Sequence, residues 1–151
     1  MSLESLYQEL ILDHAKQRVG FGLDADETAP VSHQRNPICG DEISLSAHVD
    51  GDHVHDVTWE GAGCSISQAS ASMLADLVAR DPDGVARELT RAEATELIAH
   101  FREALRSRGK LELDEDEFGD AAALSGVSKF SARVKCAMLA WVALEDVLAR
   151  C

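Results

Sequence analysis

Apolar side chains recur every three or four residues in the first 18 residues of the chain. This spacing predicts an amphipathic helix that ends at Gly20 and Gly22. The apolar face of this helix carries Leu3, Leu6, Tyr7, Leu10, Ile11 and His14. His14 is the polar member of the face, and we expect it to be a packed or capped residue at the edge of the core.

The pattern changes to alternation between residues 42 and 49. Ile43, Leu45, Ala47 and Val49 alternate with polar residues, which predicts a half-buried strand. A turn at residues 50–52 returns the chain as an antiparallel partner over residues 54–60. The preceding segment, residues 23–37, is polar and contains two prolines, so we predict a loop there.

Three more helices are predicted after the strands. Residues 65–80 are rich in small side chains and stop at Asp81 and Pro82, and residues 131–150 place Trp141 among apolar positions at helical spacing. Residues 90–109 begin with a capping box, Thr90 to Glu93. The acidic run 114–117, within residues 110–127, predicts a solvated loop. Early strands and late helices predict the α+β class, in a single domain over residues 1–151.

Composition narrows the function classes. With 151 residues and 46% hydrophobic side chains, the chain can bury a core without disulfides. The net charge of −13 argues against a nucleic-acid partner and favours a basic protein or a metal cation. No apolar run reaches the roughly 20 residues of a membrane span, and no signal peptide is evident. We therefore expect a cytoplasmic protein with no membrane contact, whose thiols stay reduced.

Three of the four cysteines lie at junctions between predicted elements. Cys39 lies in a loop two residues before Asp41, Cys64 lies between a glycine-rich turn and a helix start, and Cys136 lies in the first turns of the last helix. Helix starts favour a thiolate. The fourth cysteine, Cys151, is the terminal residue, and we expect it to be a spare thiol.

Three thiolates and one carboxylate make the four ligands of a tetrahedral zinc site. The chain has no Cys-x-x-Cys pair, so spacing alone leaves open either a metal site or three unrelated reduced cysteines. Thiolate ligands favour zinc, copper(I) or iron–sulfur over magnesium or calcium.

Three stretches, NPICGDEI, GAGCSISQASASML and ARVKCAMLAW, resemble the U-type iron–sulfur cluster assembly proteins, the family of IscU and SufU. They occur in the family's order, and the similarity covers nearly the whole chain, including the N-terminal ELILDHAKQ. The chain looks like the SufU branch for two reasons. Lys135 precedes Cys136 where IscU-type scaffolds carry a histidine, and the longer segment between Cys64 and Cys136 contains GDAAALSGVSKF, which resembles the SufU insertion.

This resemblance implies a small antiparallel sheet covered by helices on one side. It also implies a zinc ion held by Cys39, Asp41, Cys64 and Cys136, with Cys39 as the acceptor of persulfide sulfur from a SufS-type cysteine desulfurase, a pyridoxal-phosphate enzyme. On docking, a desulfurase histidine would replace Cys39 on zinc and free its thiolate. The exchange would activate Cys39, because a zinc-bound thiolate is a poorer nucleophile than a free one. The sulfur would then pass to a downstream iron–sulfur scaffold.

Arg133 matches the arginine of the family's last motif and is a candidate for orienting the mobile thiolate. The alternative for Arg133 and Lys135 is that both are solvated charges. Two other functions stay open. The chain could be a scaffold that builds an iron–sulfur cluster with the same ligands, or a structural zinc domain.

Overall fold

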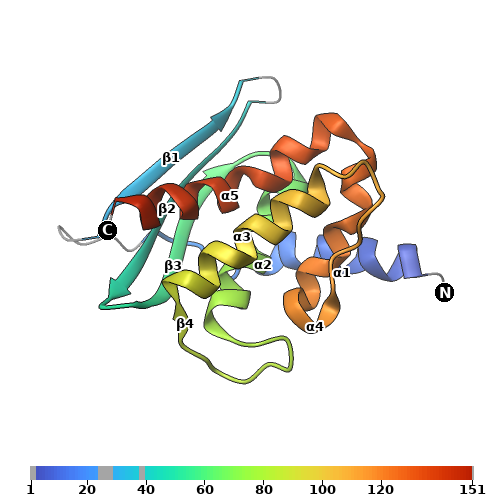
Figure 1. Cartoon of the computed structure of the whole chain (residues 1–151). Coiled ribbons are helices and arrows are strands. Elements are labelled where there is room, and N and C mark those ends of the chain that lie inside the picture. Colours follow the sequence, from blue (N-terminus) through green and yellow to red (C-terminus); the bar gives the residue numbers. More distant parts are fainter. Residues whose placement is uncertain (1–2, 24–28, 38–39, 151) are drawn as a thin grey trace.

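The computed structural model describes residues 3–23, 29–37 and 40–150. Its strands form one antiparallel sheet in the order β1-β2-β3-β4, and helices cover one face of it (Figure 1). The elements are α1 (Leu3–Gln17), β1 (Val31–Asn36), β2 (Asp41–Asp50), β3 (His53–Ala62), α2 (Ser65–Ala79), β4 (Leu89–Thr90), α3 (Arg91–Leu105), α4 (Glu115–Phe118), the 3-10 helix η1 (Gly119–Lys129) and α5 (Ser131–Ala149).

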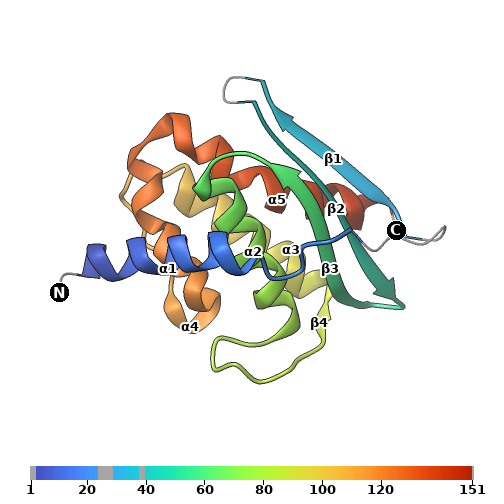
Figure 2. The ribbon, with the colours of Figure 1, turned by 180° about the vertical axis from the view of Figure 1, so that it is seen from behind.

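The helices form two tiers on the sheet. Helix α5 packs against β1 and β2, and α2 packs against β3. Seen from behind, α1 runs alongside α2, while α3 packs against α5 (Figure 2). The predicted α+β class, with a small antiparallel sheet covered on one side, is therefore confirmed.

The central hairpin follows the predicted alternation, with one irregularity. Leu45 pairs with Trp59, and both are fully buried. Between the pairs Ser46–Thr58 and His48–His55, β3 holds one extra residue, which forms a β-bulge beside Asp56 at φ 53°. The bulge turns both Val54 and Val57 into the core, although they are three residues apart.

The predicted helices at both ends and in the middle of the chain are present. The capping box is also confirmed, because Glu93 N donates to Thr90 Oγ1 at 3.1 Å and Thr90 N donates to Glu93 Oε1 at 3.0 Å. On α1 the buried face is narrower than predicted. Leu6 is 45% exposed, whereas His14 is buried.

Two predicted loops are wrong in part. Residues 31–36 form strand β1, which the sequence hid because its inward face is polar: Ser32 and Asn36 are buried and Gln34 is half-buried. Residues 115–129 form α4 and η1. There the acidic side chains occupy the first turn of α4, and Phe118 and Leu124 are buried beneath them.

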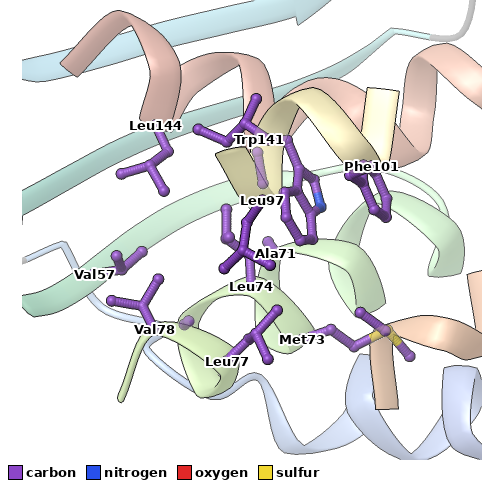
Figure 3. Close-up of a cluster of buried hydrophobic side chains, with 14 of the residues drawn as sticks. Val57, Ala71, Met73, Leu74, Leu77, Val78, Leu97, Phe101, Trp141 and Leu144 are labelled. Carbon is purple, nitrogen blue, oxygen red and sulfur yellow. The ribbon is translucent and has the colours of Figure 1, made fainter. Parts of the chain in front are cut away.

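The core fixes α5 against both of its helical neighbours. The ring of Trp141 stacks on Phe101 of α3, with centroids 3.9 Å apart and planes 7° from parallel (Figure 3). Trp141 Nε1 donates to Ser70 Oγ of α2 at 2.9 Å, and Ser70 Oγ donates to Ala137 O at 2.6 Å. Both hydrogen bonds are buried. The second one ends at Ala137, the residue after Cys136, so together they fix the position of that cysteine relative to α2.

An ion pair on the surface forms a second contact between α3 and α5. The guanidinium of Arg102 donates to both carboxylate oxygens of Glu145, at 2.9 and 2.7 Å. The pKa of Glu145 lies below its ordinary value, first because of this hydrogen bond and also because of the charges of Arg102 and Arg106.

Replacing Phe101 with alanine should lower the free energy of unfolding by about 3–5 kcal/mol, since it leaves a cavity against Trp141. Urea denaturation followed by tryptophan fluorescence measures this loss. Leu12→Ala, at a position 51% exposed, is the control and should change little. A loss for Phe101→Ala no larger than that of the control would show that the stack does not hold α5 in place.

Candidate metal centre

Three ligand-type side chains from distant parts of the chain meet at one end of the sheet. Asp41 begins β2, Cys64 immediately precedes α2, and Cys136 lies in the second turn of α5. Their ligand atoms all lie within 4.8 Å of one another. Asp41 is 2% exposed and Cys136 is 3% exposed, whereas Cys64 is only partly buried. The site is therefore buried on the strand and α5 sides and reaches solvent at Cys64.

Backbone hydrogen bonds hold the Asp41 carboxylate in position. Asp41 pairs with Asn36 across the hairpin of β1 and β2, and the turn is closed by Gly40 N, which donates to Asn36 O at 2.8 Å. Gly40 has φ +74°, a conformation that favours glycine. Asp41 Oδ1 accepts from Cys64 N at 3.0 Å, while Oδ2 lies 3.4 Å from Cys64 Sγ. One carboxylate oxygen thus fixes the group, and the other faces the thiol.

Two glycines allow the chain to pass this close to Asp41. A Cβ added at Gly63 would lie 2.5 Å from Asp41 Oδ1 and 2.7 Å from Ser67 Oγ. A Cβ at Gly61 would overlap the carbonyl oxygen of Glu42 on the neighbouring strand. The glycine-rich turn before Cys64 is therefore a packing requirement of the site.

The two cysteines occupy helix starts with different surroundings. Cys64 is the N-cap residue of α2, and its side chain makes no capping hydrogen bond. Cys136 Sγ lies 3.9 Å from both Asn36 Nδ2 and Ala132 O. Cys64 Sγ thus lies beside the Asp41 carboxylate, whereas Cys136 Sγ lies beside an amide and a backbone carbonyl.

The structure brings together three of the four ligands that the sequence proposed. The fourth, Cys39, lies outside the described residues, as does Cys151. Arg133 and Lys135 are exposed in the first turns of α5, and Arg133 lines a hollow beside Ile66. Sequence reasoning missed Asn36 and the packing role of Gly63. The only sequence signal was their position beside the motif residues Pro37 and Cys64.

A second group of ligand-type residues, His14, Asp76 and Asp120, has atoms within 4.8 Å of one another. His14 Nδ1 lies 2.8 Å from Ser72 Oγ, and Nε2 lies 3.0 Å from Asp120 Oδ2. Both ring nitrogens therefore have protein partners. The expectation of a packed histidine at the edge of the core is confirmed, and its contacts join α1 to α2 and η1.

The donor set at the first site fits zinc. Ligand atoms about 2.0–2.3 Å from a tetrahedral ion lie roughly 3–4 Å from one another. The distance of 3.4 Å between Asp41 Oδ2 and Cys64 Sγ falls in this range. Two sulfurs and one carboxylate suit zinc better than magnesium or calcium, which prefer oxygen ligands. Asp41, Cys64 and Cys136 therefore supply ligand types that suit zinc.

This fold and this site define a small α+β protein with a thiolate-rich candidate metal site. Residues 6–137 match the family model described as the NifU-like N terminal domain. The chain belongs to this family of iron–sulfur cluster assembly proteins, and its resemblance to the SufU branch is confirmed by the relatives described next.

The chain is 40% identical to the zinc-dependent sulfurtransferase SufU of Bacillus subtilis, across 99% of this chain and 93% of that protein. It is 38% identical to the iron–sulfur cluster assembly scaffold protein IscU of Streptococcus pyogenes, across 98% of this chain and 86% of that one.

Among solved structures, a candidate scaffold protein for the SUF system of Fervidobacterium islandicum has a TM-score of 0.74 and 31% identity, covering 97% of this chain and 99% of that one. A NifU-like protein of Brucella abortus, at 21% identity and a TM-score of 0.73, shares the fold over 98% of this chain and 95% of that one. Within the described residues, no helix combines the length and apolar character needed to cross a membrane.

Replacing Gly63 with alanine should weaken zinc binding by about 10–100-fold, because the new methyl group displaces the Asp41 carboxylate from Cys64 N. Competition with a chromophoric chelator measures the affinity. Gly126→Ala is the matched control, because a Cβ there meets nothing within 4 Å. Equal zinc affinities for the two variants would mean that the contact with Gly63 does not set the geometry of the site.

Proposed function

We propose that this protein carries sulfur in iron–sulfur cluster biogenesis, accepting it on Cys39 from the persulfide of a SufS-type cysteine desulfurase. The observation that carries the proposal is the convergence of Asp41, Cys64 and Cys136, since Asp41 follows Cys39 by only two positions in the sequence. The 40% identity to a zinc-dependent sulfurtransferase over nearly the whole chain supports it.

In this proposal Cys39, Asp41, Cys64 and Cys136 hold a zinc ion. Coordination to zinc would keep the cysteine thiols deprotonated at neutral pH, and zinc has no redox chemistry of its own. The protein groups have separate tasks. Asp41 and Cys64 are fixed to each other by a backbone hydrogen bond, and Cys136 is buried in a helix. We assign the role of acceptor to Cys39, as the resemblance to the SufU branch implies.

The transfer step balances without an added oxidant or reductant. The Cys39 thiolate attacks the outer sulfur of the desulfurase persulfide, and a new sulfur–sulfur bond forms on Cys39. The sulfur–sulfur bond of the donor breaks, and its electron pair leaves with the donor cysteine as a thiolate. The transferred sulfur keeps its proton and its oxidation state. We assign Arg133, exposed one turn before Cys136, to orienting the Cys39 thiolate.

The desulfurase partner would be a pyridoxal-phosphate enzyme acting on L-cysteine in the cytoplasm, and a downstream iron–sulfur scaffold would receive the sulfur. Nucleic acid is not an expected partner. These assignments rest on the resemblance to SufU and on the excess of acidic side chains.

We expect Cys39→Ser to abolish persulfide formation on the protein and its stimulation of desulfurase turnover, because serine cannot accept sulfur. Intact-mass spectrometry after incubation with desulfurase and L-cysteine measures the added sulfur atom. Cys151→Ser, at the other end of the chain, is the matched control and should react as the wild type does. Undiminished stimulation by Cys39→Ser would remove Cys39 as the acceptor.

A scaffold function is the second candidate, because iron–sulfur clusters are also held by thiolates and four relatives bear the name scaffold protein IscU. Lys135, standing where IscU-type proteins carry histidine, favours sulfur transfer. Anaerobic reconstitution with iron and sulfide separates the two. We expect no stable visible chromophore and no transfer to an apo-acceptor, whereas a stable cluster that transfers would establish the scaffold.

A further inference from the structure

Six exposed cationic side chains belong to segments at the end of the molecule that carries the candidate metal centre. They come from the turn after α3, the end of η1 and the first turns of α5 (Figure 1). We call them the basic patch: Arg106, Arg108, Lys110, Lys129, Arg133 and Lys135. The segments are in contact, since a Cβ added at Gly109 would lie 2.9 Å from Lys129 Cγ.

The basic patch stands out against a chain with 27 acidic and 14 basic residues. Arg80, Arg102 and Arg150 form ion pairs with carboxylates, and all three lie outside the patch. Three carboxylates lie nearby. Glu112 lines the neighbouring hollow, Glu115 accepts a hydrogen bond from Tyr7 of that hollow at 3.0 Å, and Glu145 pairs with Arg102 near Arg106. The cations nevertheless outnumber these carboxylates, so the local charge is positive.

An apolar hollow of about 720 Å³ adjoins the basic patch. Its apolar wall includes Tyr7 and Ile11 of α1, Ile66 of α2 and Val127 of η1. Lys129 and Arg133 of the patch, together with Glu112, also line it. Ile66 follows Cys64 by two residues, and Arg133 precedes Cys136 by three, so the hollow lies against both helix starts that carry the thiols.

Phe130 marks the edge of this hollow. Its side chain is 60% exposed, although it stands directly before α5. An exposed aromatic side chain beside an apolar hollow, with charged residues around it, is typical of a protein-binding surface. In such surfaces apolar anchors give affinity and charged rims give orientation. A surface for nucleic acid needs clustered cations but not an apolar hollow.

We propose that the basic patch and the hollow dock an acidic surface of the sulfur-donating protein. An apolar side chain of the donor enters the hollow beside Phe130, and donor carboxylates face the cations. The inference rests on the proposed function, because it assigns the face over which the persulfide arrives. The net charge of the chain favours a basic partner, whereas this inference names an acidic one. A partner at contact distance interacts with the local charge of the patch and not with the net charge of the chain.

The first test reverses charge within the patch but away from the thiols. The triple variant Arg106→Glu, Arg108→Glu and Lys110→Glu should lower the association rate constant for the desulfurase by about tenfold at low salt, with the gap closing as salt rises. The matched control, Lys16→Glu, Arg80→Glu and Arg150→Glu, changes net charge by the same amount on exposed residues elsewhere. It should stay within about twofold of wild type.

The second test addresses the hollow. Phe130→Ala should raise the dissociation rate constant several-fold, whereas Leu12→Ala, on a similarly exposed apolar residue, should not change it. Equal behaviour of the two triple variants, or of the two alanine variants, would overturn the docking inference. So would equally tight binding of an oligonucleotide that competes with the desulfurase.

Persulfide formation on Cys39 keeps this inference separate from the proposed function. If wild-type protein is persulfidated while both triple variants associate at the same rate, only the docking inference fails. If wild-type protein neither binds the desulfurase nor gains sulfur, both fail. Normal persulfidation of the patch variant at saturating desulfurase, with slow association at low concentration, is the result expected of a docking surface.

Discussion

The hydrogen bond from Cys64 N to Asp41 Oδ1 is the contact on which the metal centre depends. It joins the start of α2 to the start of β2, and the β2–β3 hairpin lies between these two points in the sequence. Its geometry requires the chain before Cys64 to pass so close to Asp41 that Gly63 has no room for a side chain. The same bond satisfies a backbone N–H at a helix start, so local folding and ligand placement have one cause.

The third described ligand is placed by the core. Ser70 joins α2 to α5 through Trp141 Nε1 and Ala137 O, next to Cys136. Trp141 in turn stacks on Phe101, so the distance between the two thiols depends on aromatic packing three helices deep. Interiors this closely packed deform little, so the core holds Cys136 in place relative to α2.

Much of the fold follows from the sequence, because the major helices and the central hairpin have clear apolar periods. Strand β1 has no such period. Its buried positions are Ser32 and Asn36, and Asn36 faces Cys136 instead of an apolar partner. A pattern of hydrophobic positions cannot reveal a strand whose inward side chains serve a polar site. The motif residues Asp41, Cys64 and Cys136 were recognisable, but Asn36 and Gly63 act through contacts that only the tertiary structure contains.

Acidic and basic side chains lie in different regions of the molecule. Glu93, Glu96, Asp114, Asp116 and Glu117 line one cleft between α3 and the segment at α4. The cations lie instead at the far end of α3, beside the helix starts that face the thiols. Screening limits each charge to about 8–10 Å at physiological salt, so a docked surface responds to its own end of the molecule. In the proposed docking, the acidic cleft would repel the acidic surface that the basic patch attracts, and the two charges together would orient the partner toward the thiols.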